Sequence, residues 1–148
     1  MALAYLTQRQ QIKHLSKKEY LALRELCSLA KNMYNVALYN IRQHFFNTGK
    51  YLNYYDNYHL AKENENYKLL NSNMAQQIIK EADGSFKSFF ELLKLKKAGK
   101  YDAKVKIPKY LPKNEYFSLI IGQIRIKDNG ALDIPVSREF KKLNRKTS

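Results

Sequence analysis

The sequence predicts an α+β fold in which a helical bundle is inserted after the first strand of a partial antiparallel β-sheet or barrel. Apolar residues recur at steps of three and four in two long segments, which is the pattern of amphipathic helices. After Gly99 this period changes, and Pro108 and Pro112 exclude a continuing helix. We therefore divide the chain into a first strand in residues 1–14, a helical domain in residues 15–99, and a return to the β domain with a basic tail in residues 100–148.

The first long helix is predicted to begin after Ser16 and to end at Gly49. Ser16 and Glu19 have the spacing of a capping box, in which each side chain accepts a hydrogen bond from the other residue's backbone. Gly49 readily adopts the left-handed conformation that ends a helix. Such a helix would be roughly 45 Å long, which is typical of a scaffold for an extended surface. Its apolar face comprises Tyr20, Leu23, Cys27, Ala30, Tyr34, Ala37, Ile41 and Phe45.

Two further helices are predicted. A short one begins in the tyrosine-rich segment 51–58 and runs to about Glu63, where Asn64-Glu65-Asn66 is expected to end it. A second long helix begins after the cap candidates Asn71 and Ser72 and ends at Gly99. We expect the two long helices to be antiparallel, with the short helix over one end. The inward face of the second long helix comprises Ala75, Ile78, Ala82, Phe86, Phe89 and Leu93.

The last part of the chain is predicted to contain strands. Residues 115–121 and 123–127 are strand candidates, and Asp128-Asn129-Gly130 is a hairpin turn because Asn-Gly tolerates positive φ. The alternating Leu132, Ile134 and Val136 would form the returning strand. At the N-terminus, Leu3, Tyr5 and Leu6 would add a strand to the same sheet. The tail from Arg138 to Ser148 is polar and is expected to be frayed.

The charge of the chain is large and uneven. It has 148 residues, with 27 Lys and Arg against 13 Asp and Glu, which gives a net charge of +14. Residues 94–148 alone hold fifteen basic and five acidic groups, a net of +10. Such an excess favours polyanionic partners, with nucleic acid first and an anionic membrane surface second. No apolar run approaches the roughly 20 residues that span a bilayer, and we expect a cytoplasmic protein.

The sequence contains no recognisable catalytic or metal-binding motif. His14, His44 and His59 lack the spacing of a metal site, and the five glycines form no phosphate-binding loop. Cys27 lies on the predicted apolar face, where it is best explained as a small buried hydrophobe. The carboxylates are scattered. We therefore expect neither an enzymatic activity nor a cofactor in this chain.

Residues 94–113, which we call the lysine segment, are the strongest candidate for a binding surface. They hold eight lysines and a single acid, Asp102. Phosphate neutralisation combined with aromatic stacking is the usual composition of a nucleic-acid groove. The alternative is a solvated helix end followed by a charged loop. The predicted backbone-contacting residues are Lys96, Lys97, Lys100, Lys104, Lys106, Lys109 and Lys113, and the predicted stacking residues are Tyr101 and Tyr110.

Two other features have two interpretations each. The four tyrosines of residues 51–58 either pack over the open end of the helix pair or stack on bases. Gln76 and Gln77 stand at the start of the second long helix, from which an amide can contact an adenine edge. Most such amides are merely solvated.

Five segments of the sequence occur in an order that resembles a known family. They are residues 31–35 (KNMYN), 42–52 (RQHFFNTGKYL), 75–80 (AQQIIK), 85–90 (SFKSFF) and 106–110 (KIPKY). Together they are similar to the N-terminal part of TnpB, the OrfB-type proteins of insertion sequences. These proteins are RNA-guided DNA nucleases related to the type V CRISPR effectors. The resemblance covers nearly the whole chain, from about Gln8 to Val136.

The resemblance implies a wedge-like β-barrel that is interrupted after its first strand by a helical recognition domain. In the family these two parts together bind the guide RNA, the guide–target duplex and a short target-adjacent DNA motif. Nuclease chemistry belongs to a downstream RuvC-like domain, which binds divalent metal such as Mg²⁺, and to a zinc ribbon. Neither is present in this sequence, so Mg and Zn are expected only there. The implied partners are guide RNA, double-stranded target DNA and the downstream nuclease part, in a prokaryotic cytoplasm at the nucleoid.

The resemblance also suggests which residues contact the adjacent DNA motif. By alignment with the family, these positions fall on Tyr54, Tyr58, Ser72, Asn73 and Gln76. Tyr54 and Gln76 match residue types with that role in the family, whereas Tyr58, Ser72 and Asn73 do not clearly match. The lysine segment corresponds to the return into the wedge domain, where guide RNA and DNA backbone lie close together.

Three other functions remain open from the sequence. One is a self-sufficient DNA transposase, which the missing acidic triad disfavours. Another is a stand-alone DNA-binding repressor or transposase accessory protein. The third is a structural or oligomerisation protein whose tyrosines bury a partner.

Overall fold

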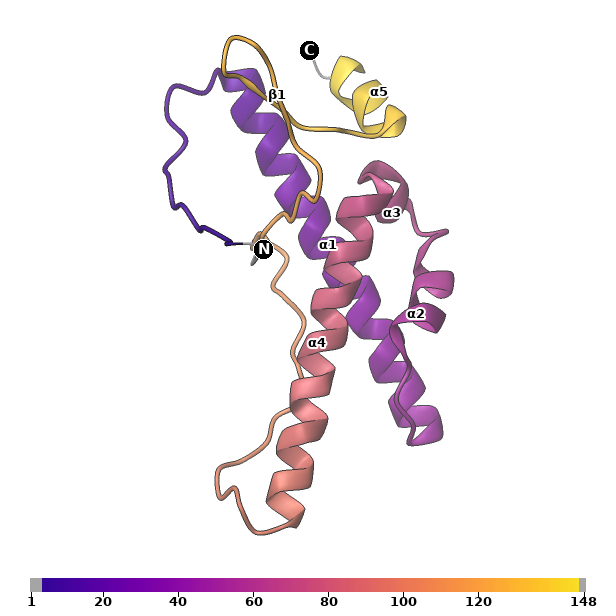
Figure 1. The fold of residues 1–148 in the computed structure, drawn as a ribbon. Helices are drawn as coiled ribbons and strands as arrows, with labels where there is room; N and C mark the ends of the chain where they lie inside the picture. Colours follow the sequence, from indigo (N-terminus) through magenta and orange to yellow (C-terminus); the bar gives the residue numbers. More distant parts are fainter. Residues whose placement is uncertain (1–3, 147–148) are drawn as a thin grey trace.

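The computed structural model describes residues 4–146, and over these residues the chain is mostly helical with one small antiparallel sheet (Figure 1). The predicted α+β class is confirmed at this level. The helices are α1 (Lys17–Thr48), α2 (Tyr54–Ala61), α3 (Glu65–Leu69), α4 (Ser72–Lys97) and α5 (Arg138–Lys146), and the strands are β1 (Arg125–Ile126) and β2 (Leu132–Asp133).

The predicted boundaries of α1 are confirmed by its caps. The Ser16 hydroxyl accepts a hydrogen bond from the backbone N–H of Glu19 at 3.1 Å, and the Glu19 carboxylate accepts one from the backbone N–H of Ser16 at 3.0 Å. Hydrogen bonding of the Glu19 carboxylate, first to the backbone N–H of Ser16 and second to its hydroxyl, holds the pKa of Glu19 below its ordinary value. At the other end, Gly49 has φ 70° and donates to the Phe45 carbonyl at 2.7 Å.

The two long helices run in the same direction and cross, so the predicted antiparallel pair is wrong (Figure 1). The Tyr34 hydroxyl lies 3.0 Å from the Ser85 hydroxyl. Further along both helices, the Phe45 ring lies 5.3 Å from the Phe90 ring. Later residues of α1 therefore contact later residues of α4. A short loop would have forced the antiparallel arrangement, but a long connection does not.

That connection contains two short helices where the sequence predicted one. Asn64 was expected to end a helix, and instead its side chain caps α3 by accepting from the Asn66 N–H at 2.9 Å. α2 is held on α1 by Asn57, which is fully buried and donates to the Ala37 carbonyl at 3.1 Å. α2 and α3 carry the chain back, so that α4 begins beside the middle of α1 (Figure 1). The Asn71 side chain caps α4 there, as predicted.

The core lies between α1 and α4 and is closed by α2, α3 and one residue of α5. Tyr20 was predicted to face inward and is exposed, because the first turns of α1 extend beyond α4. Leu23, Cys27 and Phe45 are half-buried. The buried apolar residues of the long helices are Leu26, Leu29, Ala30, Met33, Tyr34, Ala37, Leu38, Ile41, Met74, Ala75, Ile78, Ile79, Ala82, Phe86 and Phe89.

The chain after α4 is extended but mostly unpaired. Gly99, with φ 73°, follows the helix end as predicted. Residues 115–121 were predicted to be a strand, and they form none. Their backbone lies against α1 instead: the Phe117 N–H donates to the Cys27 carbonyl at 3.2 Å, and its ring stacks on Tyr34 at 4.7 Å. A strand needs a neighbouring strand for its ladder, and a helix offers none.

The hairpin turn at residues 128–130 is confirmed. β1 and β2 pair in the register Arg125↔Asp133 and Ile126↔Leu132. Of the turn residues only Gly130 has positive φ, at 83°, and its N–H donates to the Lys127 carbonyl at 2.8 Å. The strands are two residues long, so the described chain forms a hairpin rather than a barrel.

Both chain ends differ from the prediction. No strand forms in residues 4–14, where Tyr5 and Leu6 are 89% and 96% exposed. The strands of the hairpin are each two residues long, which is too short an edge for a further strand. Leu3 lies outside the described residues. The tail, predicted to fray, forms α5 as far as Lys146, and Phe140 is 2% exposed. The Ser137 hydroxyl accepts from the Phe140 N–H at 3.1 Å and donates to the Leu69 carbonyl at 2.7 Å. A single buried aromatic therefore orders this basic helix.

Candidate nucleic-acid interface

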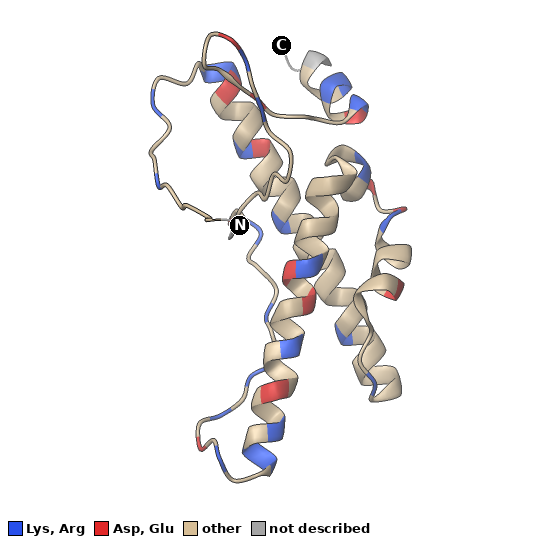
Figure 2. Cartoon of the chain, viewed as in Figure 1, with Lys and Arg blue, Asp and Glu red and all other residues tan. Residues whose placement is uncertain are grey.

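The lysine segment covers the end of α4 and the loop that returns along the helices (Figure 2). All eight of its lysines are exposed. Among them, within the described chain, Lys94 is the one that pairs with a carboxylate, that of Glu91 at 3.5 Å. Seven cations therefore face solvent without a neutralising partner. An ordinary solvated surface carries the two signs of charge in similar numbers, whereas this segment has eight lysines and one acid, Asp102.

Residues 104–113, which we call the strap, alternate between the core and solvent. Val105, Ile107 and Leu111 are partly buried and pack against the core cluster. Lys106 and Lys109 lie between them in the sequence, Lys104 directly precedes Val105, and all three lysines are exposed. The apolar side chains thus fix the segment on the helices, while its charges point outward.

Side chains of α1 hold the strap by its backbone. The Asn35 amide donates to the Leu111 carbonyl at 3.0 Å and accepts from the Leu111 N–H at 2.9 Å. Arg42 donates to the Pro108 carbonyl at 2.9 Å. Lys31 is 5% exposed and donates to the Lys113 carbonyl at 2.6 Å. The contacts move backward along α1 as the strap advances, so the strap is antiparallel to α1.

A basic cleft of about 560 Å³ opens where the strap passes Arg42. Its charged lining is Arg42, Lys104, Lys106 and Lys109, without a carboxylate. The Arg42 guanidinium carbon lies 4.7 Å from the centroid of the Tyr110 ring and 5.6 Å from that of Phe46. The rings of Tyr110 and Phe46 and the Pro108 carbonyl together hold the planar guanidinium of Arg42 in one place. A fixed guanidinium is well suited to binding phosphate.

The two predicted stacking residues differ in their surroundings. Arg42 covers one face of the Tyr110 ring, and Tyr110 as a whole is 40% exposed. Tyr101 is partly buried at the start of the loop. Arg42, Asn35 and Lys31 were missed by the sequence analysis. Their role depends on a segment some 70 residues away in the sequence, and no local pattern marks it.

A second face brings together three of the residues predicted to contact the adjacent DNA motif. Tyr54, Tyr58 and Gln76 surround Tyr67, which the sequence analysis missed. The Gln76 amide donates to the Tyr67 hydroxyl at 3.2 Å, and the rings of Tyr58 and Tyr67 are 6.1 Å apart. Burial, and then the charge of Tyr58, raises the pKa of Tyr54, so its phenol stays protonated as a donor. Lys80 lies 5.6 Å above the Tyr54 ring.

The other two residues of that prediction lie at the first turn of α4. Ser72 is exposed and stands one turn before Gln76, on the same side of the helix. Asn73 is exposed, but its side-chain oxygen accepts a hydrogen bond from the Gly122 N–H at 3.1 Å. This hydrogen bond attaches Gly122, which lies shortly before the β1–β2 hairpin in the sequence, to α4. The side chains of Gln76 and Tyr54 are both only partly buried, and both lie beside Tyr67 on the same face of the molecule.

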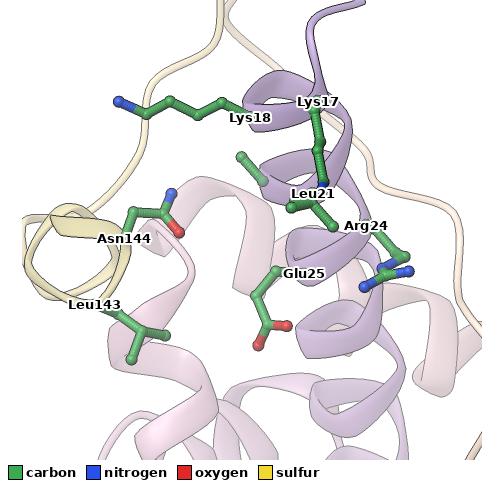
Figure 3. A pocket seen from close by; sticks show the side chains of 8 residues that line it. Lys17, Lys18, Leu21, Arg24, Glu25, Leu143 and Asn144 are labelled. Atoms are coloured by element: carbon green, nitrogen blue, oxygen red, sulfur yellow. The ribbon is translucent and has the colours of Figure 1, made fainter. Parts of the chain in front are cut away.

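A further cleft of about 650 Å³ separates the first turns of α1 from α5 (Figure 3). Leu143 and Asn144 of α5 lie opposite Lys18 and Glu25 of α1. Because Glu25 stands among the lysines of this cleft, its charge is mixed. It is less suited to a polyanion than the cleft at Arg42.

Residues 4–146 hold neither a metal-ligand cluster nor a membrane-spanning helix. No three His, Cys, Asp or Glu side chains there stand close enough to hold a metal ion, and no helix there is long and apolar enough to cross a membrane. Burial raises the pKa of the Cys27 thiol. Comparison with models of protein families, with curated proteins and with solved structures finds no match for this chain.

Proposed function

We propose that this chain is a nucleic-acid-binding module of the TnpB type, namely the wedge and recognition part of an RNA-guided DNA endonuclease. The observation that carries the proposal is the lysine segment, in which seven exposed cations have no carboxylate partner and four of the seven lie on the strap that α1 holds. Guide RNA and double-stranded DNA are the proposed ligands. The order of the five sequence segments supports the family, and the lysines support the ligand class.

The two faces have separate tasks in this proposal. The lysine segment and the cleft at Arg42 contact phosphates, which gives affinity without sequence preference. The face of Tyr54, Tyr58 and Gln76 contacts base edges, for which tyrosine hydroxyls and an amide are suitable donors and acceptors. Cleavage chemistry, with its Mg²⁺ and Zn²⁺, is assigned to downstream domains. The purified chain is expected to leave supercoiled plasmid intact in Mg²⁺ or Mn²⁺.

The proposal is tested by the salt dependence of RNA binding. Each lysine that neutralises a phosphate releases counterions, so log affinity falls with log salt by about 0.7–0.9 per contact. If four lysines make such contacts, doubling the salt weakens binding roughly tenfold. Structured RNA is expected to bind at least as tightly as duplex DNA. A preference for guide-free duplex would instead indicate a repressor.

The decisive variant replaces Lys100, Lys104, Lys106 and Lys109 together by Gln. Its slope should fall by about 3, because four contacts are lost, while circular dichroism shows an unchanged fold. The matched control replaces Lys13, Lys17, Lys18 and Lys68, which are exposed and lie outside the lysine segment. It removes the same charge, so equal slopes in both variants would contradict a localised interface. An unchanged slope in the first variant would contradict any role of the segment.

A further inference from the structure

A pocket of about 600 Å³ lies beside the strap, between α1, the end of α2 and Tyr110. Its volume is within the usual range for small-molecule sites, roughly 300–1,000 Å³. The lining differs from that of the basic cleft at Arg42. Two tyrosines, three asparagines and Glu63 line it, together with aliphatic side chains. Aromatic and amide groups suit a planar polar ligand better than they suit a phosphate.

Tyr110 connects this pocket to the phosphate-binding cleft. Its ring is 40% exposed, and the guanidinium of Arg42, which lines the cleft, covers one face. A ligand in the pocket can therefore stack on the remaining face of Tyr110. Tyr39, 54% exposed on α1, lines the same pocket and offers a second aromatic surface. Lys109 precedes Tyr110 in the chain and is exposed, so a phosphate attached to the ligand has a cation within reach.

The pocket also presents hydrogen-bonding groups of both kinds. Asn40 donates through its amide nitrogen to Asn57 at 3.0 Å, which leaves its amide oxygen as an acceptor. Asn64 accepts through its oxygen from Asn66 at 2.9 Å, which leaves its amide nitrogen as a donor. Glu63 adds a carboxylate, 3.6 Å from Lys68 at the surface. Donors and acceptors at the edge of an aromatic surface are what a nucleobase needs.

We propose that this pocket binds one unpaired nucleobase of a single-stranded segment, with the base stacked on Tyr110 and its phosphate at Lys109. A base within a duplex is paired and stacked on both sides, so only an unpaired base can enter. The inference rests on the proposed function and adds to it a preference for nucleic acid with single-stranded positions. It makes Tyr39 and Tyr110 binding residues and the neighbouring amides groups that orient the base.

The test is fluorescence anisotropy with a short single-stranded RNA, the same RNA with abasic sites throughout, and a blunt RNA duplex. Loss of one base-stacking ring is expected to weaken binding roughly 5- to 150-fold. Tyr39→Ala and Tyr110→Ala should each show this loss with the normal RNA and none with the abasic RNA. Tyr110→Phe keeps the ring and should bind as wild type does. Tyr55→Ala, an exposed tyrosine outside the pocket, is the matched control.

Each outcome decides between the alternatives. Because removing Tyr110 also uncovers Arg42, the Tyr39→Ala variant is decisive, since Tyr39 is exposed and its removal frees no cation. The proposed base-binding pocket is wrong if Tyr39→Ala and Tyr110→Ala both bind the single strand as tightly as wild type does. It is also wrong if both variants lose as much affinity for the abasic RNA as for the normal RNA. If the pocket is refuted but wild-type binding still depends on salt as expected, the proposed function stands without the base-binding pocket. If wild type binds none of the three RNAs, both proposals fail.

Discussion

Asn35 is the residue through which α1 fixes the middle of the strap, and its replacement by Ala tests how the strap is held. The substitution removes the two hydrogen bonds between the side-chain amide and the Leu111 backbone, of 2.9 and 3.0 Å. A neutral hydrogen bond in a protein contributes about 0.5–1.5 kcal/mol net, so the pair contributes about 1–3 kcal/mol. Alanine also has the higher helix propensity, which offsets part of this loss by about 0.5 kcal/mol.

The free energy of unfolding is measured by urea denaturation followed at the helical circular-dichroism band. Asn47→Ala is the matched control, because Asn47 is exposed in the last turn of the same helix and gains the same propensity. Asn35→Ala should therefore be less stable than the control by about 1–3 kcal/mol. Hydrogen exchange should show the Leu111 amide losing its protection. Equal midpoints for the two variants, with that amide still protected, would refute the proposed attachment of the strap.

The same variant connects stability to binding. Asn35→Ala removes no charge, yet it loosens the middle of the strap that carries Lys104, Lys106 and Lys109. If the ordered strap aligns these lysines with phosphates, the RNA affinity of the variant should fall. The loosened strap must then become ordered when RNA binds, and the lost conformational entropy weakens binding. Unchanged affinity in a variant with a demonstrably mobile strap would show that the lysines act as a diffuse charge. The alignment argument would then be wrong, even though the charge argument holds.

Four other predictions concern the fold. Phe140→Ala should lower the free energy of unfolding by about 3–5 kcal/mol, since a fully buried ring is lost, and limited trypsin digestion should then cut within α5. Gly49→Ala should destabilise by about 1–2 kcal/mol because its φ of 70° is left-handed, whereas Gly84→Ala, with nothing within 4 Å of the added Cβ, should stabilise α4 by up to about 1 kcal/mol. Both are measured by urea unfolding. Because the pKa of Glu19 is lowered, its cap stabilises α1 fully at pH values above the ordinary carboxyl pKa of 4.5. This stabilisation is lost as the pH falls through the lowered pKa. An NMR titration should show this shift, and Ser16→Ala should reduce it, because the substitution removes the hydroxyl but keeps the backbone N–H, which is the larger cause.

Local signals in the sequence predicted the two long helices well. The capping box at Ser16, the caps at Asn71 and the glycines at 49 and 99 all act within a few residues, and each was found where predicted. The direction of α4 was not predictable in the same way. It depends on α2 and α3, whose lengths of eight and five residues produce no clear period. α5 was missed because one buried phenylalanine among charged residues carries no repeat.

The candidate interface was predictable in composition but not in geometry. The excess of lysine in residues 94–113 is visible in the sequence, and those side chains are exposed. Arg42 and Asn35 lie among ordinary polar positions of α1, and only the strap that packs on them gives them a role. The prediction of a strand in residues 115–121 was wrong for a related reason. Alternating apolar residues allow either a sheet or an extended segment on a helix, and the available neighbour decides.

The strap is attached to α1 through main-chain atoms, namely the carbonyls of Pro108, Leu111 and Lys113 and one N–H. Carbonyl groups are the same for every amino acid, so these bonds do not depend on what stands at the outward positions 104, 106 and 109. Mutations there can accumulate during evolution without loosening the scaffold. An engineer could likewise replace the three lysines with other side chains. The strap is in this sense an exchangeable recognition sequence on a constant helical support.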